Sequence, residues 1–451
     1  MEYFNRNTVE YRNAIKRNLI TRYLMRIEFL TYYETAIGEI TKDLLLDVQG
    51  QININYKQLT RRSCSLSISN VDQKYLPTSP DSPIWYQKKF KLWLGIQDDH
   101  NDIYWWSQGI YYIVSATANA HTVNIEGIDK GGALDGTLKT NMAEVQYILK
   151  SGSAIADILR DMLALNMGSN AEIANSSAYG GSNLPIDPVP PLIDLKFNSE
   201  RIRADISVDA NNYLGNLLTS VADNYGSDIY YDINGHLRCS AQADIFYVDG
   251  YKYMAHQWDF VDLSEPNYQY TFDGANAVTV YTNLSVDTQA LIKAQEEHKE
   301  SENPDSTESL TDTIDMDDTL GAENLCYTAY NVNPLSPINV GAVGLRRMES
   351  QEIDYIDTTE SDMRARCQQY AVMLLHRQTC VSTNLSFNAP IIPHLDVNKT
   401  IGITDKYQKI DNETFVVQSI TIPLGAGAMQ ITATNINWLP AATNLEGMGV
   451  G

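Results

Sequence analysis

The sequence predicts a mainly β protein of the α+β class, with two antiparallel β-barrel domains and an α+β domain between them. Apolar and polar residues alternate in two long regions, one near each end of the chain, as they do in strands with one buried face. Segments with apolar residues at helical spacing fall mostly between these regions. The length of 451 residues exceeds one ordinary hydrophobic core, so several domains are expected.

The expected organisation has an arm, three domains and a tail. These are an N-terminal arm (1–21), a first β-barrel domain (22–140), an α+β middle domain (141–262), a second β-barrel domain (263–440) and a C-terminal tail (441–451). The second barrel domain is expected to carry an acidic, flexible insertion at about 287–323, because Glu, Asp, Ser and Thr dominate that segment.

The N-terminal arm places Tyr11, Ile15 and Leu19 at helical spacing among several Arg and Lys residues. A basic arm on an acidic protein could dock on an acidic neighbour. The alternative interpretation is a solvated helix face.

Strand patterns fill the first barrel domain. Apolar residues occupy the even positions from Leu44 to Tyr56, and the series continues from Cys64 to Ile68. The stretch from Phe90 to Gly136 then predicts three consecutive antiparallel strands, rich in aromatic and β-branched residues. Gly109, in the middle of the second of these strands, predicts a bulge or bend.

The middle domain mixes helix and strand signals. Residues 153–163 predict a capped helix, and a Gly, Ser, Asn and Pro rich loop over 168–191 leads to a predicted strand over 193–197. A second helix is predicted over 211–224. Asn234-Gly235 then predicts a tight hairpin, the strongest local turn signal in the chain.

The second barrel domain repeats the strand pattern. Strands return from Tyr268 to Tyr281, and Thr359 with Asp362 forms a capping-box pattern at the head of a predicted helix over 360–378. Further strands are predicted in the ranges 381–387, 401–403, 415–422 and 429–433.

Composition limits the function classes. Lys plus Arg total 33 and Asp plus Glu total 56, and the resulting net charge of -23 argues against a protein that grips nucleic-acid phosphates. No apolar run is long enough to span a membrane and the N-terminus lacks a secretory apolar stretch, so we expect no membrane insertion and synthesis in the cytoplasm. The cysteines are far apart and odd in number, which favours buried thiols: Cys64, Cys239, Cys326, Cys367 and Cys380.

The sequence assigns no catalytic residue, no cofactor and no metal site, because it contains no nucleophile elbow, phosphate loop or zinc-protease helix. The densest group of possible cation ligands is Asp98, Asp99, His100 and Asp102. It lacks the Gly and the distal Glu of a calcium loop, so an exposed hairpin tip is favoured. His394 with Asp396 is a weaker candidate pair.

Aromatic residues offer a possible carbohydrate platform at Tyr104, Trp105 and Trp106. Neighbouring side chains on a strand point to opposite faces, so we expect at least one of these tryptophans in the core. Trp258 is a second exposed-aromatic candidate. The acidic run of Asp312, Asp315, Asp317 and Asp318 is interpreted as a solvated charge run.

Three groups of motifs carry a resemblance to a known family: 111–113, 127–130 and 134–136 in the first barrel, 214–222, 228–232 and 234–235 in the middle domain, and 360–378, 381–387, 393–397, 416–420 and 423–424 in the second barrel. Together they resemble bacteriophage tail and baseplate hub proteins, the adaptors between tail tube and spike. The acidic segment from Asp287 to Asp318 departs from the pattern. The resemblance implies that both barrels are of the tail-tube type.

The resemblance further implies a structural virion protein and not an enzyme. Its expected partners are two further copies in a homotrimer, a hexameric tail tube or distal tail protein, and a trimeric spike or a tail fibre or lysin protein. DNA would pass through an acidic lumen during ejection without specific binding. The alternatives are a tail-associated cell-wall hydrolase and a host-glycan-binding tail protein.

Overall fold

The computed structural model describes residues 23–40, 49–56, 58–70, 72–97, 103–119, 121–139, 147–150, 152–164, 186–202, 206–208, 212–225, 227–241, 259–260, 264–271, 275–282, 326–332, 339–344, 348–353, 360–378, 382–425 and 427–435. The N-terminal arm, the acidic insertion and the C-terminal tail lie outside these ranges.

The first β-rich region forms the strands that the alternating pattern predicts and one further strand, Ala36–Ile40, that the pattern does not predict. They are β1 (Tyr23–Leu30), β2 (Ala36–Ile40), β3 (Gln49–Asn55), β4 (Arg62–Ser69), β5 (Lys89–Gln97), β6 (Ile103–Ala118) and β7 (Thr122–Asp129). The expected bulge is present: Leu92 pairs with Gly109 while Trp93 pairs with Ser107, so Gln108 is the extra residue. Gly109 has φ +134°, a conformation that side chains disfavour.

The second β-rich region contributes its own strands to the same sheet. They are β13 (Asp259–Phe260), β14 (Ser264–Thr271), β18 (Ser382–Ala389), β19 (Thr400–Asp405), β20 (Ile410–Pro423) and β21 (Met429–Asn435). Among the described residues the sheet has 13 strands, with the order β14-β18-β21-β20-β3-β4-β7-β6-β5-β1-β2, and β13-β19 joins it at β20. The two regions, expected as separate barrels, are therefore joined by antiparallel hydrogen bonds between β3 and β20.

The sheet contains two copies of one five-stranded arrangement. The first unit (β3, β4, β5, β6 and β7) has the order β3-β4-β7-β6-β5, and the second unit (β14, β18, β19, β20 and β21) has the order β14-β18-β21-β20-β19. Every pairing within both units is antiparallel. The units differ outside this set, because β1 pairs with β5 antiparallel whereas β13 pairs with β19 parallel.

The two units also share their register. The long strand of each unit has a bulge at the matching place, after Ile113 in β6 and after Val417 in β20. The pairing on the other side is irregular at matching places too, after Leu92 in β5 and after Ile403 in β19. Bulges re-aim strands and are built-in features of a fold, so their repetition indicates one structural unit used twice.

The segments just before β5 and β19 also share a backbone feature. The backbone N–H of Gln87 donates to the Ile113 carbonyl at 3.0 Å, and that of Asn398 donates to the Val417 carbonyl at 2.9 Å. Gln87 and Asn398 both adopt the left-handed region, with φ values of 57° and 59°. Such a conformation is uncommon for residues other than glycine, so its occurrence at two matching positions strengthens the assignment of a repeat.

The remaining elements form an α+β half. They are η1 (Lys130–Ala133), β8 (Tyr147–Leu149), α2 (Ile155–Ala164), β9 (Leu192–Ile193), α4 (Leu195–Ser199), β10 (Ile206–Val208), α5 (Leu214–Tyr225), β11 (Ser227–Tyr231), β12 (Leu237–Ala241), β15 (Ala277–Thr282), β16 (Cys326–Tyr330), α9 (Val340–Val343), β17 (Met348–Ile353) and α10 (Glu360–Gln378). Small sheets connect them: β10-β8, β11-β12-β9 and β16-β15-β17.

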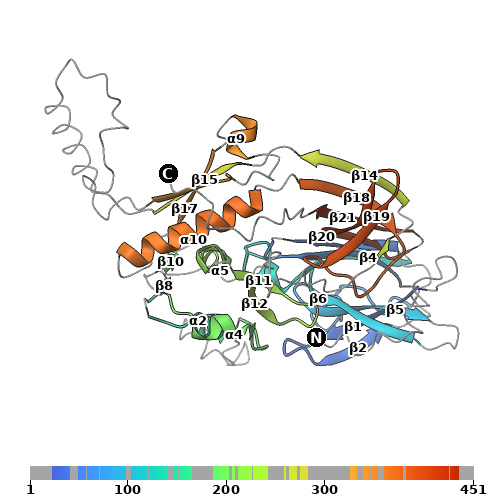
Figure 1. Cartoon of the computed structure of the whole chain (residues 1–451). Helices are drawn as coiled ribbons and strands as arrows, with labels where there is room; N and C mark the ends of the chain where they lie inside the picture. The colour runs from blue at the N-terminus through green and yellow to red at the C-terminus, as the bar shows by residue number, and fades with distance from the viewer. Residues whose placement is uncertain are drawn as a thin grey trace, which may run out of the picture.

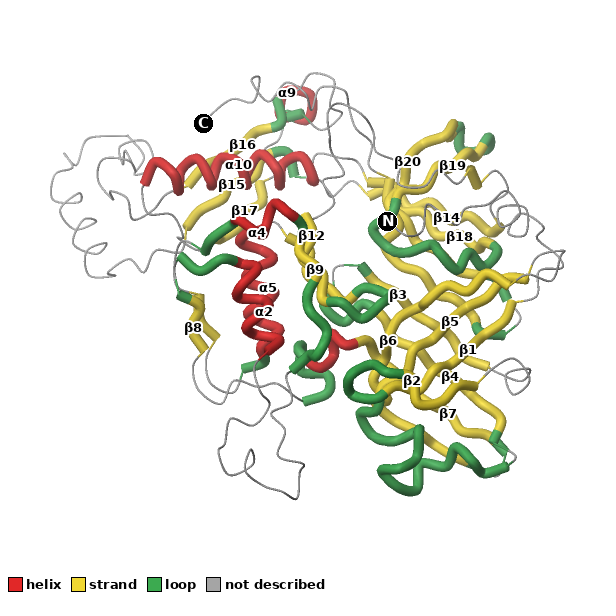
Figure 2. The backbone as a smooth tube through the Cα atoms, turned by 90° about the horizontal axis from the view of Figure 1, so that it is seen from below, coloured by secondary structure: helices red, strands yellow, loops and turns green. Residues whose placement is uncertain are grey.

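Two hydrophobic cores divide the molecule differently from the expected domains. One core gathers buried residues of both units, for example Ile52, Phe90, Phe415 and Ile431. The other joins α2, α5 and β11 to β15, β16 and α10. Figures 1 and 2 show the helices and small sheets on one side and the large sheet on the other. The range 263–440 thus contributes to both halves.

The mainly β, α+β fold class is confirmed, and most elements lie where the sequence predicts them. The helix over 360–378 and the hairpin at Asn234-Gly235 are present. The strand predicted over 193–197 is wrong in part, because it ends at Ile193 and α4 follows with Asp194 at its N-cap. The apolar residues at 193, 195 and 197 therefore do not share one face of a strand: Phe197 is buried in the short helix, while Leu195 is 87% exposed. No described helix is long and apolar enough to cross a membrane.

Candidate functional site

A buried polar joint connects the two units and the α+β half. It has an arginine cluster (Arg61, Arg62, Asp129, Asp228 and Asp396) and a lysine cluster (Glu34, Lys89, Lys130 and Asp187). A buried charge is costly unless it is paired and hydrogen-bonded, so each of these side chains constrains the elements that carry its partners.

Arg62, the first residue of β4, is the centre of the arginine cluster. Its side chain is 1% exposed, and it donates from Nη1 to the Tyr231 carbonyl at 3.1 Å and from Nη2 to Asp396 Oδ2 at 2.6 Å. Tyr231 belongs to β11 and Asp396 to the segment between β18 and β19. Burial lowers the pKa of the guanidinium, but the combined attraction of Asp396, Tyr111, Asp129 and Tyr230 outweighs this effect, and the pKa is raised overall. One cation therefore ties three parts of the chain together.

Asp129 closes the same cluster at the end of β7. Its carboxylate accepts hydrogen bonds from the backbone N–H of Arg62 at 2.8 Å and from that of Gly131 at 3.0 Å, and it caps η1. Burial raises the pKa of Asp129 to about 7, although the charge of Arg62 and the backbone hydrogen bonds act in the opposite direction. The joint therefore contains a carboxyl group that titrates near neutral pH.

Arg61 contacts the α+β half, whereas Arg62 contacts both that half and the second unit. Its guanidinium pairs with Asp228 of β11, and its Cζ lies 3.6 Å from the ring centroid of Tyr230. The side chains of Arg61 and Asp228 are 3% and 10% exposed. Arg61 directly precedes β4, so two consecutive arginines at the start of this strand contact different residues of β11.

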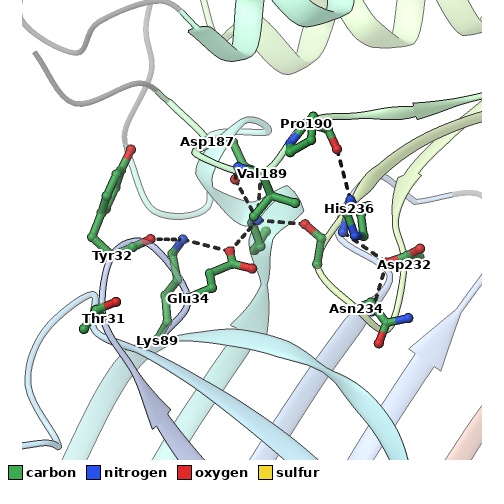
Figure 3. Close-up of polar contacts among 12 residues, drawn as sticks. Thr31, Tyr32, Glu34, Lys89, Asp187, Val189, Pro190, Asp232, Asn234 and His236 are labelled. Carbon is green, nitrogen blue, oxygen red and sulfur yellow. Dashed lines mark hydrogen bonds and ion pairs between the residues drawn. The ribbon is translucent and has the colours of Figure 1, made fainter. Parts of the chain in front are cut away.

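The lysine cluster joins the first β-rich region to the loop before β9 and to the β11–β12 hairpin (Figure 3). Lys130 Nζ donates to Glu34 Oε1 at 2.6 Å, to Asp187 Oδ1 at 2.8 Å and to the Gly235 carbonyl at 2.7 Å. Lys89 Nζ also donates to Glu34 Oε1, at 3.0 Å. Burial lowers the pKa of Lys89, and the neighbouring charge of Lys130 adds to this effect. Two cations face two carboxylates, so the cluster is balanced in charge.

The bulge in β6 supplies uncharged contacts to the joint. Ser107 Oγ donates to the Ile233 carbonyl at 2.6 Å, while Gln108 Nε2 donates to the Pro393 carbonyl at 2.8 Å. Trp106 packs against His394 with ring centroids 5.4 Å apart. The extra residue in the bulge lets consecutive side chains reach the α+β half and the second unit.

The three motif groups that carry the resemblance to hub proteins meet at this joint. Asp129 and Lys130 come from the first group, Asp228 and Gly235 from the second, and Asp396 from the third. Their contacts fix the relative orientation of the units and the α+β half. Among the described residues, no group of three or more His, Cys, Asp or Glu side chains is placed to hold a metal ion.

Other candidate residues have different outcomes. Asp396 binds Arg62 and His394 packs on Trp106, so both residues make contacts within the joint. Trp106 is buried at 7% exposure while Trp105 is partly exposed and stacks with Arg26, as alternation predicts. The turn of Asp98, Asp99, His100 and Asp102, Trp258 and the run of Asp312, Asp315, Asp317 and Asp318 lie outside the described residues.

The cysteine prediction holds for three positions. Cys64, Cys239 and Cys367 are buried free thiols, whereas Cys326 is exposed and Cys380 lies outside the described residues. Cys326 begins β16, which pairs with β15 in a small sheet of the α+β half.

The sequence analysis did not identify Arg61, Arg62, Glu34, Lys89 or Asp187 as site residues. Arg62 carried a usable signal, because it stands two residues before Cys64 on the core-facing side of an alternating strand. A cation at a core-facing position requires a buried partner.

No protein-family model matches this sequence, and no curated protein matches it. Solved structures do. The tail protein from Neisseria meningitidis MC58 superposes with a TM-score of 0.52 and 11% identity, over 92% of this chain and 96% of that protein. The 43 kDa tail protein of prophage MuSo2 from Shewanella oneidensis gives a TM-score of 0.48 and 10% identity, over 93% and 98% of the two chains.

A component of the type VI secretion system from Escherichia coli, the c3393 protein, gives a TM-score of 0.41 and 8% identity, over 92% of this chain and 77% of that protein. At such identities a likeness concerns the fold alone. Over nearly its whole length, this chain is similar in fold to the tail protein from Neisseria meningitidis.

Proposed function

We propose that this chain is a structural virion protein, a tail or baseplate hub that forms a ring between a hexameric tail tube and a trimeric spike or fibre apparatus. The single observation that carries the proposal is the repeat of the five-stranded unit. The two units share their strand order, their bulges and a residue in the left-handed backbone region at a matching position. The fold likeness to the Neisseria meningitidis tail protein supports it.

The repeat suits an adaptor between six-fold and three-fold partners. A homotrimer of a chain with two equivalent units offers six similar surfaces to a tube, while the α+β halves offer three surfaces to a spike. Closed rotational symmetry then satisfies both partners without unmatched interfaces. The expected neighbours are a tail tube or distal tail protein on one side and a spike, fibre or lysin protein on the other.

The buried polar joint supports this role because an adaptor must hold its two units at a fixed angle. Arg62 contacts both the second unit and the α+β half through a side chain that is 1% exposed. Breaking a buried ion pair typically costs about 3–5 kcal/mol, so a change of angle that separated these groups would be strongly opposed.

The net charge of -23 supports a channel that DNA can traverse without specific binding. Carboxylates repel the phosphate backbone, so an acidic lumen would not retain DNA during ejection. A computed or measured potential that is positive along the channel of a solved assembly would contradict this part of the proposal.

We propose that the protein acts by assembly and has no hydrolytic activity of its own. In the joint, the charged groups described above are occupied by contacts between elements. Incubation with host peptidoglycan should release no soluble fragments above the level of a buffer control. Fragment release by the purified protein would support the hydrolase alternative.

Native mass spectrometry of the purified protein tests the proposal directly. The expected species has three times the 50.6 kDa mass of the chain, and negative-stain images should show a ring with an open channel. A protein that stays monomeric at all concentrations, including inside assembled particles, would contradict it.

A further inference from the structure

The contact between β3 and β20 is a model, within one chain, for a contact between chains. Ser419, Ile420, Thr421 and Ile422 of β20 pair antiparallel with residues 52–55 of β3. The backbone N–H of Tyr56 donates to the Gln418 carbonyl at 2.9 Å, and that of Leu424 donates to the Gly50 carbonyl at 2.9 Å, so both ends of the contact are closed.

The repeat assigns an equivalent to each strand of this contact. The end of β20 corresponds to Ser115–Ala118 of β6, which follows the matching bulge, and β3 corresponds to β14. Among the described residues, β14 pairs only with β18 and lies at an edge of the sheet (Figure 1). The Ser115–Ala118 segment pairs with β7 on one side, and its other side has no strand partner among the described residues.

Resting on the proposed ring, we propose that the outer edge of β14 in one copy pairs antiparallel with Ser115–Ala118 of the next copy. The partner is a second copy of this chain, and the register is that of the β3–β20 contact. Ser115 would face Thr271, Ala116 would face Tyr270, Thr117 would face Gln269 and Ala118 would face Tyr268.

The side chains at these positions fit one another. Across the β3–β20 contact Thr421 Oγ1 lies 3.1 Å from Asn53 Oδ1, and the equivalent positions hold Thr117 and Gln269, again a hydroxyl opposite a carboxamide. On the other face, isoleucines fill the core on both strands of the contact, at positions 52, 54, 420 and 422. Their equivalents are two alanines on β6 and two tyrosines on β14, so each small residue would face a large one.

The alanines and tyrosines of the proposed contact on β6 and β14 are more exposed in the single chain than their equivalents in the β3–β20 contact. Ile420 and Ile422 are 1% and 0% exposed, whereas Ala118 is exposed and Ala116 is partly buried. Tyr270 is 49% exposed, although its equivalent Ile54 is 2% exposed. An open strand edge with exposed large side chains is prone to pairing with another chain, and pairing in a ring would cover it.

The geometry favours β6 over β2 as the partner of β14. The β2 strand ends the same sheet, but it has no counterpart in the second unit, so no contact within the chain serves as a model for it. A β14–β6 contact joins different edges of identical chains. Such a head-to-tail contact closes into a ring when its rotation allows.

Engineered disulfides test the register. In the β3–β20 contact Thr421 and Asn53 form the pair type without direct backbone hydrogen bonds, since the flanking even positions of β3 carry them. In such pairs the Cα atoms are about 4.5 Å apart, a separation that a disulfide can bridge. We would prepare Thr117→Cys and Gln269→Cys separately, each in a background with Cys326→Ser and Cys380→Ser.

Mild oxidation of the mixed variants should give a covalent dimer of chains, and the double variant should give a ladder that ends at the trimer. Thr117→Cys alone should give none, because the contact is head-to-tail. Ala116→Cys mixed with Gln269→Cys is the matched control, since its side chains would lie on opposite faces. Equal cross-linking of this control, or of Gly38→Cys on β2 with Gln269→Cys, would overturn the register or the choice of β6.

A proline scan of β14 gives a second readout. Alternation from the β3–β20 contact places the N–H of Tyr270 on the outer edge and that of Gln269 toward β18. Tyr270→Pro should weaken assembly by about tenfold or more while the thermal midpoint of the isolated chain stays unchanged, because proline is tolerated on an edge. Gln269→Pro should lower that midpoint.

The outcomes separate this inference from the proposed function. Suppose that the wild-type protein forms a ring of three copies, but the Thr117→Cys and Gln269→Cys variants do not cross-link and Tyr270→Pro does not weaken assembly. This result would refute the contact and leave the hub role in place. A wild-type protein that forms no ring would contradict both.

Discussion

Replacing Arg62 by methionine should uncouple the two halves of the molecule. The change keeps an apolar stem of similar length and removes the cation that contacts the Tyr231 carbonyl and Asp396. It leaves the buried Tyr231 carbonyl without this donor and the Asp396 carboxylate without its counter-ion. Removal of one partner of a buried ion pair costs about 3–5 kcal/mol, so a large loss of stability is expected.

The structure indicates the lower end of that range. Arg62 is 1% exposed, so the folded wild-type protein must keep a cation away from water. An apolar side chain at this position removes that cost. The side chain of Asp396 is 28% exposed, and its carboxylate can regain water when the guanidinium is absent. We therefore expect a loss of about 3 kcal/mol in the free energy of unfolding.

Urea unfolding followed by two probes measures the effect. Helix content reports mainly on the α+β half, and tryptophan fluorescence reports mainly on the sheet half, which holds Trp85, Trp93, Trp105 and Trp106. The two transitions should separate in Arg62→Met if the joint couples the cores. A double-mutant cycle with Asp396→Asn isolates the pairwise energy.

Arg160→Met is the matched control, because Arg160 pairs with Asp157 on the surface, where the side chains are 52% and 68% exposed. An exposed pair contributes about 0–1 kcal/mol, so this variant should unfold like the wild type. A loss of stability in Arg62→Met no larger than that in the control, or a coupling energy close to zero in the cycle, would refute the role of Arg62 in coupling the two cores.

Three further predictions concern other parts of the structure. Lys130→Met should destabilise the protein by about 3–5 kcal/mol in urea unfolding, because it leaves Asp187, whose side chain is 1% exposed, without its cation; Lys130→Met/Asp187→Leu should recover part of that loss. The pKa of Asp129 is about 7 in the folded protein and near 3.9 in the unfolded chain, so the folded state binds this proton more tightly. The protonated carboxyl group therefore contributes its full stabilisation below about pH 4, and this contribution is lost as the pH rises through 7. Unfolding measured from pH 4 to 8 should show wild type losing stability relative to Asp129→Asn across that window, and parallel curves would contradict the assignment. Gly136→Ala should lower the thermal midpoint, because φ is +93° there and a Cβ would lie 2.4 Å from the Tyr213 ring; an unchanged midpoint would contradict this.

The parts of the fold that the sequence predicts are those with a local cause. The capping-box pattern of Thr359 and Asp362 in the sequence predicts the helix over 360–378, and Asn234-Gly235 sets the β11–β12 hairpin, in which Gly235 has φ +82°. Period-2 alternation places most strands of both units. Each signal lies within a few residues of the structure that it specifies.

Contacts between distant segments leave no such signal. The β3–β20 pairing joins residues near 52 to residues near 422, and Arg62 reaches Asp396 across 334 positions. Alternation states that Arg62 faces inward but not which carboxylate it meets. For the same reason, β14 and β15 read as one strand region, although β14 joins the large sheet and β15 joins the α+β half.

The central claim is that one chain supplies two equivalent units to a closed ring. Electron cryomicroscopy of the purified assembly tests it most directly. We expect a three-fold ring in which the first and second units alternate, so that its tube-facing side has near six-fold symmetry around an open channel. A two-fold dimer, or a ring in which the two units occupy unrelated positions, would contradict the claim.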